Sequence, residues 1–301
     1  MIKKITDRIS AVFTEDGFSS GNCVLVEDTV NLMIDSGAGR ALKETRPERI
    51  NILLNSHHHI DHMGGNDFFP AAVKMAHPLE IEFMQVPEKL SATDAWKELM
   101  DQDCILHARE INGRPNRLYQ PWHIDEIMQP GQVIECGHTR IRVIHTPGHT
   151  AGHCSFHFPE ENILFLADIC LSKVGPWYGG SDSSVDDFIH SINAVREMKP
   201  EMVVTGHYTD ILRENIDAIL VEYRDRILKR EGRILDYLKD TPSTIHELAG
   251  KRFIYPDHPN PFVVYWEKSM IMKHLERLMG LGEVTREEGN RFRTTVTASS
   301  I

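Results

Sequence analysis

Short apolar runs, separated by turn-forming residues, fill much of the first two thirds of the chain. Such runs, rich in Val, Ile, Leu and Phe, predict buried β-strands. Helical periodicity lies between several of them, and one helix is expected to begin after Gly64 and Gly65. The mixture predicts a fold that packs layers of helices and strands together. We expect strands at about residues 5–13, 22–27, 30–35, 50–55, 72–76, 133–136, 141–145, 153–158, 163–166 and 202–205.

Two helical segments interrupt this pattern. Residues 78–129 are helical and irregular, and we interpret them as an insertion that either covers an active site or buttresses the outside of the fold. Another helix is expected near Val185, where Ser183 or Ser184 would accept a backbone hydrogen bond as the N-cap.

The character of the chain changes near residue 220, where helical periodicity replaces the strand pattern. We expect an amphipathic helix at residues 223–238, a short helix through Leu248 with a capping box from Thr244 to Glu247, and a longer helix at residues 262–279. A hairpin is expected at residues 284–295, with its turn at Gly289 and Asn290. The pattern therefore predicts two domains, at residues 1–220 and 221–301.

Length and composition agree with two domains and argue against a membrane-spanning or a disulfide-stabilised secreted protein. At 301 residues the chain exceeds one average domain. No apolar run approaches the ~20 residues of a membrane-spanning helix, and the N-terminus lacks the apolar core of a signal peptide. The five cysteines are scattered and never spaced as Cys-x-x-Cys, which favours buried free thiols. We therefore expect a cytoplasmic protein without membrane contact.

The most informative stretch follows the expected strand at residues 50–55. It places four strong metal ligands close together, namely His57, His59, Asp61 and His62. In an extended chain His57 and His59 point the same way, and a turn at Asp61 brings His62 round. Imidazole and carboxylate ligands without a thiolate suit zinc, iron or manganese, and such a site is more often catalytic than structural.

Further metal-ligand candidates follow three later apolar runs. His149 lies in a Pro/Gly turn after the first, Asp168 ends the second, and His207 ends the third. Loops at strand ends present chemistry on a rigid scaffold. The recurrence therefore predicts one metal site assembled from several strand ends.

These motifs together resemble the metallo-β-lactamase superfamily of hydrolases. The family pattern is an early strand-end Asp, H-x-H-x-D-H, a lone His in a T-P-G-H-T turn, a bridging Asp and a late Gly-His, and all occur in this order within residues 1–215. The resemblance implies an α/β fold, a four-layer αβ/βα sandwich, and two divalent metal ions, with zinc expected first and iron or manganese as alternatives. It also implies that Asp35 orients a ligand histidine. By the same resemblance one ion would be held by His57, His59 and His149, the other by Asp61, His62 and His207, and both by Asp168.

The resemblance further implies roles in catalysis. Two metal ions would make a bridging hydroxide available to attack a carbonyl or phosphoryl centre. Asp61 is the candidate to accept a proton, and Tyr208 or Tyr178 is the candidate to donate a hydrogen bond to the oxyanion. Trp177 and Tyr178 lie in a glycine-bounded loop after the expected bridging Asp168, and we expect them to line the substrate pocket.

Three classes of reaction fit this site. The first is hydrolysis of a thioester or lactone, as in the glyoxalase II-like and lactonase-like branches. The second is phosphodiester cleavage, because the C-terminal helices and hairpin resemble the winged-helix appendage of β-lactamase-like single-strand endoribonucleases. The third is an iron-dependent oxidoreductase, as in flavodiiron proteins, which typically carry Glu where this chain has His59.

Charge distinguishes the first two classes. Residues 1–225 hold 20 Lys and Arg against 34 Asp and Glu, whereas residues 226–301 hold 13 against 10. Tight binding of nucleic acid usually needs a basic stripe, and only Arg286, Arg291 and Arg293 on the expected hairpin offer a cluster worth testing. We therefore expect a small-molecule substrate rather than a nucleic acid. The appendage would serve equally to cover the rim of the active site or to form a homodimer contact.

Overall fold

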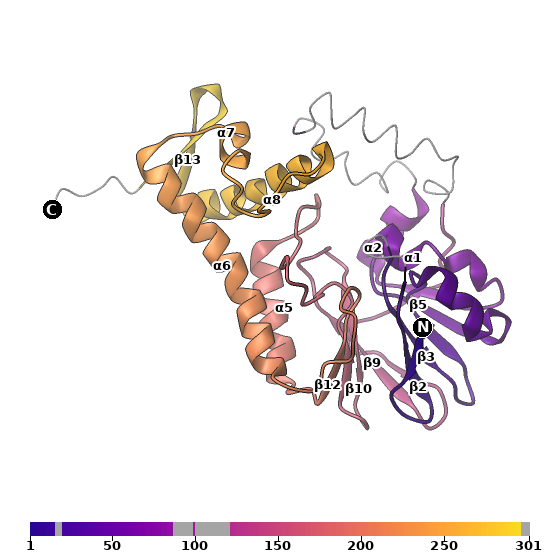
Figure 1. The fold of residues 1–301 in the computed structure, drawn as a ribbon. Coiled ribbons are helices and arrows are strands. Elements are labelled where there is room, and N and C mark those ends of the chain that lie inside the picture. The colour runs from indigo at the N-terminus through magenta and orange to yellow at the C-terminus, as the bar shows by residue number, and fades with distance from the viewer. Residues whose placement is uncertain (16–19, 87–98, 100–120, 296–301) are drawn as a thin grey trace.

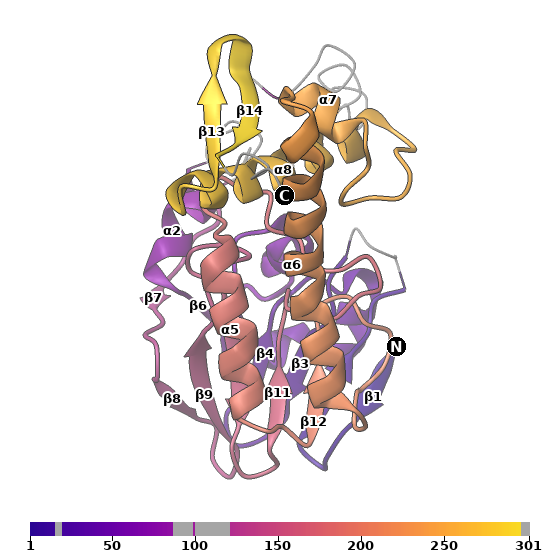
Figure 2. The same cartoon turned by 90° about the vertical axis from the view of Figure 1, so that its left-hand side faces the viewer.

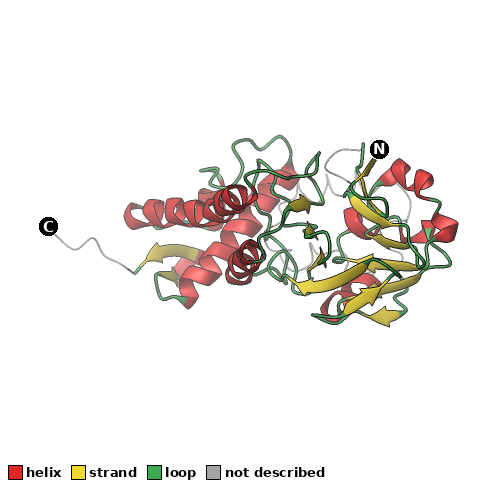
Figure 3. Cartoon of the chain, turned by 90° about the horizontal axis from the view of Figure 1, so that it is seen from below, coloured by secondary structure: helices red, strands yellow, loops and turns green. Residues whose placement is uncertain are grey.

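Two β-sheets lie face to face at the centre of the molecule, and helices cover the outer face of each (Figure 3). The computed structural model describes residues 1–15, 20–86, 99 and 121–295. The order helix, sheet, sheet, helix is the four-layer arrangement that the sequence predicts. Figure 1 shows α5 (Val185–Glu197) and the long α6 (Ile216–Asp240) along the outer side of the second sheet.

The first sheet holds seven strands in the order in which they occur along the chain. Its first four strands pair antiparallel, and from the fourth strand onward the pairs are parallel. The strands are β1 (Ile2–Lys4), β2 (Ile9–Val12), β3 (Cys23–Val26), β4 (Leu32–Ile34), β5 (Ile52–Asn55), β6 (Val73–Ala76) and β7 (Glu126–Ile127).

The second sheet holds five strands in the order β12-β11-β10-β9-β8. All neighbours pair antiparallel except β11 and β12, which are parallel. The strands are β8 (Val133–Glu135), β9 (Arg140–His145), β10 (Cys154–Phe158), β11 (Ile163–Phe165) and β12 (Met202–Val204).

Short helical turns cover the outer face of the first sheet and connect its strands. The longest 3₁₀ helix among them has seven residues and is labelled η2. These elements are η2 (Gly39–Thr45), η3 (Pro47–Arg49), α1 (Ile60–Met63), η4 (Asn66–Phe68) and α2 (Pro78–Gln85).

The alternation of side chains along each strand builds separate apolar layers. In β3, Val24 faces the second sheet, whereas Leu25 packs under the outer layer of the first sheet. In β11, Phe165 faces the first sheet, whereas Leu164 packs under α5 and α6. These strands are therefore buried on both faces, which is why they read as continuous apolar runs in the sequence.

The C-terminal residues form three helices and a hairpin, as the sequence predicts. After α6 come α7 (Ile245–Ala249), α8 (Pro261–Gly280), β13 (Val284–Glu287) and β14 (Arg291–Thr294). Thr244 and Glu247 form the expected capping box at α7. Helix α6 runs without a break across residues 220 and 221, where the sequence predicts a domain boundary. One apolar cluster also joins the second sheet to these helices.

Two predicted elements differ from the structure. The strand expected at residues 5–13 begins only at Ile9, because residues 5–8 form the turn between β1 and β2, where the Thr6 side chain accepts hydrogen bonds from the amides of Arg8 and Ile9. The helix expected after Gly64 and Gly65 is only the three-residue 3₁₀ helix η4, and the helical turn α1 lies before these glycines. A Cβ atom on Gly65 would lie 2.2 Å from the carbonyl oxygen of Ser36, so this glycine permits a close backbone approach.

The predicted insertion at residues 78–129 is described only at its ends. It begins with α2 and ends with β7, which extends the first sheet. Residues 87–98 and 100–120 lie outside the described residues, so a cover over the active site stays a prediction. No helix in the described part of the chain has the length and apolarity needed to cross a bilayer. The cytoplasmic location and the homodimer contact also stay predictions.

Candidate metal centre

The ligand candidates gather at one edge of the two facing sheets. In the first sheet β4 and β5 are parallel, and they end just before Asp35 and His57. In the second sheet β9 and β11 are both antiparallel to β10, so they run in the same direction as β12. His149, Asp168 and His207 therefore follow strand ends that share one edge. This shared direction brings together ligands that lie far apart in the sequence.

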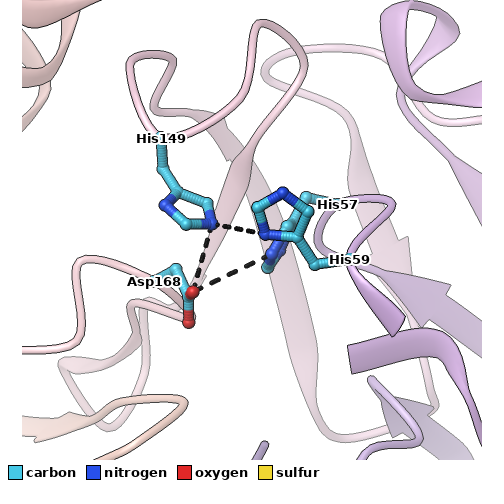
Figure 4. A group of neighbouring side chains, drawn as sticks. All are labelled: His57, His59, His149 and Asp168. Carbon is cyan, nitrogen blue, oxygen red and sulfur yellow. Dashed lines mark hydrogen bonds and ion pairs between the residues drawn. The ribbon is translucent and has the colours of Figure 1, made fainter. Parts of the chain in front are cut away.

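The carboxylate of Asp168 lies between two groups of histidines. Its Oδ2 is 3.1 Å from His149 Nε2 and 3.9 Å from His57 Nε2, an arrangement that Figure 4 shows together with His59. Its Oδ1 is 2.9 Å from His62 Nε2 and 3.3 Å from Nε2 of His207. Each oxygen thus faces a different group, as a ligand shared by two ions would do.

Two candidate ligand groups therefore lie side by side. His57, His59, His149 and Asp168 each offer a ligand atom within 4.8 Å of the others. The same holds for the second group, in which His207 Nε2 lies 3.2 Å from Asp61 Oδ2. The structure thus brings all seven predicted ligands together. The second group is Asp61, His62 and His207.

Asp35 holds two of the ligand histidines in place. Its Oδ2 lies 2.8 Å from His62 Nδ1, and the ring nitrogen donates to it in the tautomer that leaves Nε2 free. The same carboxylate accepts hydrogen bonds from the amide and hydroxyl of Ser56, at 2.7 and 2.8 Å. The Ser56 hydroxyl in turn lies 2.9 Å from Nδ1 of His57. Asp35 therefore orients one histidine directly and a second through Ser56.

Residues in loops near the second sheet orient two further ligands, His149 and Asp168. Nδ1 of His149 lies 2.9 Å from the carbonyl oxygen of Trp177, to which it donates, so its Nε2 faces Asp168. The amide of Asp168 donates to Nε2 of His153 over 3.1 Å. His153 and Ser56 were not expected from the sequence to take part. The only signal for His153 is its place in the Gly-His pair that follows the T-P-G-H-T turn.

The backbone at the strand ends is unusual in two places. Asp35 and Ala167 have φ values of 61° and 43°, which are left-handed conformations that cost energy for residues with a Cβ atom. At Gly206 a Cβ would lie 2.6 Å from the His62 ring and 2.7 Å from Asp168 Oδ1. Only glycine fits beside the ligands at that position.

The two ligand groups differ in charge, because the pKa values of His57 and His59 in the first group are lowered and the pKa of His62 in the second is raised. Burial, together with the neighbouring imidazoles, holds the pKa values of His57 and His59 well below their usual range. Burial alone would also lower the pKa of His62, but Asp168 and Asp35 raise it well above the usual range. Burial alone would raise the pKa of Asp168, yet the adjacent imidazoles, His62 first, hold that pKa well below its usual range. A cation at the second group must therefore displace protons.

The residues present fit divalent metal ions. Nε2 of His57 is buried and has no hydrogen-bond partner among the described residues, although burying such a group unpaired is costly. A set of imidazoles and carboxylates without thiolates matches zinc, iron or manganese. The structure therefore supports binding of divalent metal ions at this site.

Glu80 on α2 is a further residue that supports the site and that the sequence did not indicate. Its buried carboxylate accepts hydrogen bonds from the amide of His58 and the hydroxyl of Thr150, at 2.8 and 2.7 Å. It also accepts from the amide of Gly152 and contacts Nδ1 of His58. His58 adjoins His57, and Thr150 follows the ligand histidine of the second sheet. One carboxylate thus joins the two loops that carry the first ligand group.

The predicted tyrosines lie differently from the metal ligands. Trp177 adjoins the site, with its ring centroid 5.4 Å from that of His59 and 5.4 Å from that of His149. The hydroxyl of Tyr178 instead lies 2.8 Å from Nε2 of His274, in the helical layer. Tyr178 is fully buried against the helical layer, whereas the Trp177 ring faces the ligand histidines. The roles predicted for Tyr178 as oxyanion donor and pocket wall therefore need correction, whereas that of Tyr208 stays a prediction.

Comparison with known families agrees with this geometry. The sequence profile of the Metallo-beta-lactamase superfamily matches residues 16–207. The chain belongs to this superfamily, which confirms the resemblance and the α/β fold that the sequence predicts.

Two relatives of the chain have the names of hydrolases. A hydroxyacylglutathione hydrolase from Rhodospirillum rubrum is 25% identical over 223 residues, which cover 73% of this chain and 70% of that protein. An atrochrysone carboxyl ACP thioesterase from Aspergillus fumigatus is 26% identical over 215 residues, which cover 68% and 55%. A metallo-beta-lactamase family protein from Thermus thermophilus has a TM-score of 0.75 at 22% identity, over 97% of this chain and 100% of that one. The chain is thus an enzyme of the hydrolase class within this superfamily.

Replacing Asp168 by alanine removes the carboxylate that faces both ligand groups. We expect wild-type protein to hold about two divalent ions per chain after loading with zinc, and the Asp168→Ala variant to hold clearly fewer while it keeps its circular dichroism spectrum. Metal content by plasma mass spectrometry after gel filtration measures this. An Asp168→Ala variant with the full wild-type metal content would contradict the shared role.

The Glu80 carboxylate should make stability depend on acidic pH. Burial alone would raise the pKa of Glu80. The adjacent His58 and the hydrogen bonds that the Glu80 carboxylate accepts instead lower this pKa from 4.5 to about 2. Because its pKa is lower in the folded state, the ionised Glu80 carboxylate stabilises the fold above pH 4.5. This stabilisation is lost as the pH falls toward 2. We expect Glu80→Gln to lose about 3 kcal/mol of unfolding free energy at pH 6, and the loss to shrink as the pH falls.

Urea unfolding of metal-free protein at several pH values between 6 and 3 measures the difference. Glu48→Gln, an exposed position in η3, is the control and should show no such trend. A difference between wild type and Glu80→Gln that stays constant across this range would show that the buried carboxylate is not the cause.

Proposed function

We propose that this chain is a metal-dependent hydrolase that cleaves thioesters at a centre of two ions. The observation that carries the proposal is the Asp168 carboxylate, whose two oxygens face two separate ligand groups. His57, His59 and His149 would hold one ion, and the group around Asp61 the other. When bound, two such ions lower the pKa of water toward neutrality and polarise a carbonyl oxygen.

Asp61 is the residue best placed to accept a proton. Its side chain is 22% exposed, against 10% for that of Asp168, so it is the more open of the two carboxylates at the site. Its Oδ2 lies 3.2 Å from Nε2 of His207, which holds the carboxylate beside the second ligand group. A carboxylate in this position can take the proton that the attacking water loses.

Trp177 would bound the acyl side of the substrate. Its ring lies at an angle of 76° to the ring of His59 and 59° to that of His149, so it closes the first ligand group on one side. An indole face offers a large apolar surface for an acyl chain. This contact would orient the carbonyl carbon toward the site without adding a charge.

The hairpin arginines weigh against a nucleic-acid substrate. Arg291 donates to the carbonyl oxygen of Pro242 and pairs with Glu247 at 3.1 Å. Arg293 pairs with Glu287 at 3.1 Å. Arg286 donates to the side-chain oxygen of Asn290. Two of the three hairpin cations thus have acidic partners, which makes a poor stripe for phosphates, and most of the negative charge lies in the remainder of the chain. Nuclease activity is therefore the second candidate rather than the first.

The donor set of the first ligand group, which includes His59, also concerns the oxidoreductase alternative, because the ligand types influence which metal binds. Nδ1 of His59 lies 2.9 Å from Nε2 of His149. The first group contains three imidazoles and one carboxylate. A site rich in nitrogen suits zinc, which has no redox chemistry, as well as it suits iron. Together with two relatives named as thioester-type hydrolases, the donor set supports hydrolysis of a thioester.

A substrate panel with zinc-loaded protein tests this choice. The panel contains an acyl-glutathione, an acyl-coenzyme A, a lactone, a phosphodiester and single-stranded RNA. We expect kcat/KM for at least one thioester to exceed that for the phosphodiester by about 100-fold or more, or about 2.7 kcal/mol of transition-state stabilisation.

The Asp168→Ala variant is the control for activity from contaminating enzymes, and it should lose turnover of every compound in the panel. Faster cleavage of RNA or the phosphodiester than of any thioester would overturn the proposed substrate class. Full activity of a preparation freed of metal would overturn the metal-dependent reaction as a whole.

A further inference from the structure

The segment at residues 174–181 connects the metal centre to the C-terminal helices. It follows Asp168 and precedes α5, and its Trp177 carbonyl accepts the hydrogen bond of His149. Figure 2 shows α6 running from the sandwich, beside α5, up to the C-terminal elements. Side chains from α6 and α8 contact this segment at several points.

Arg230 on α6 makes the central contact. Its guanidinium donates to the carbonyl oxygens of Pro176 and Val174, each at 2.7 Å, and to the hydroxyl of Tyr178 at 3.2 Å. Only 5% of Arg230 is exposed, so these acceptors replace water around a buried charge. At Gly175 φ is 99°, and a Cβ there would lie 2.9 Å from Arg230 Nη2. The backbone of the segment is therefore shaped around the guanidinium.

Helix α8 adds two further contacts. Nε2 of His274 lies 2.8 Å from the hydroxyl of Tyr178, and Nδ1 of the same ring lies 3.2 Å from Glu231. The ammonium group of Lys273 donates to the carbonyl oxygen of Ser181 at 2.9 Å. Both ends of the segment are thus tied to helices that come after residue 216 in the chain.

These contacts fix the position of the Trp177 carbonyl group, which accepts the hydrogen bond that orients the ligand His149. Trp177 lies between Pro176 and Tyr178, the two residues that Arg230 holds. Its carbonyl accepts from Nδ1 of His149, which leaves Nε2 as the free nitrogen toward Asp168. If the segment moved, that hydrogen bond would weaken and the His149 ring would lose its fixed tautomer and direction.

We infer that Arg230 is a positioning residue for the metal centre, and that the C-terminal helices set the geometry of His149 through it. This inference rests on the metal binding in the proposed function, but not on the substrate. It assigns α6 and α8 a function in the site, whereas the sequence predicts a separate appendage that covers the rim or forms a dimer contact. Arg230 itself touches no ligand atom of the site in the described contacts.

The test compares Arg230→Met with two controls on the same helix. Arg233→Met removes a guanidinium that also donates to two backbone carbonyls, those of Phe253 and Arg252, both outside the segment. Leu238→Ala removes a fully buried side chain and costs about 2–5 kcal/mol of stability. The first control matches the chemistry that is lost, and the second matches the loss of stability.

The readouts are the zinc affinity of the folded protein, by competition with a chromophoric chelator, and the absorption spectrum of cobalt-loaded protein. We expect Arg230→Met to weaken zinc binding by about 10-fold or more, the usual effect of losing a residue that orients a ligand, and to change the cobalt spectrum. Arg233→Met and Leu238→Ala should keep the wild-type affinity and spectrum.

Tyr178→Phe decides the question if Arg230→Met does not fold. It removes only the hydroxyl that joins Arg230 and His274, and it should weaken zinc binding in the same direction. Zinc affinity of the folded Arg230→Met or Tyr178→Phe variant equal to that of the controls would overturn the inference. Failure of the wild type itself to bind zinc would instead overturn the proposed function, so the two failures are distinguishable.

Discussion

The structure depends on one buried carboxylate held between two sets of imidazoles. Asp168 comes from the second sheet, whereas His57 and His62 come from the first, so the site exists only where the two sheets meet. A buried charge is tolerated when it is paired, and a lost partner is costly. The buried Asn22 reinforces this junction, because it immediately precedes the third strand of the first sheet and donates to the carbonyl oxygens of Thr205 and Tyr208.

Contacts from different parts of the fold orient several of the ligands. Asp35 fixes His62, Glu80 joins the two loops of the first group, and the Trp177 carbonyl fixes His149. These contacts come from the first sheet, from α2 and from the segment held by α6. A small change in any of these contacts leaves the imidazole ring in place but turns it in another direction. A metal site depends on the direction of its ligand rings. The fold as a whole therefore acts as the support for the site.

The metal ligands could be predicted because each follows a strand end in a short motif, and parallel strands bring such ends to one edge. The supporting contacts could not. Glu80 reaches Gly152 across 72 positions of sequence, and Arg230 reaches Val174 across 56. No local pattern marks either residue, since an acidic side chain in a helix and a basic one in an amphipathic helix are ordinary. Trp177 and Tyr178 look alike in sequence, and only the backbone direction separates them.

The central claim is that Asp168 lies between two divalent ions, and anomalous diffraction tests it most directly. Crystals grown with zinc would be measured above and below the zinc absorption edge. We expect two peaks about 3.5–4 Å apart, one beside His57 and His149 and the other beside His62 and His207, with the Asp168 carboxylate between them. A single peak, or two peaks that do not flank this carboxylate, would contradict it.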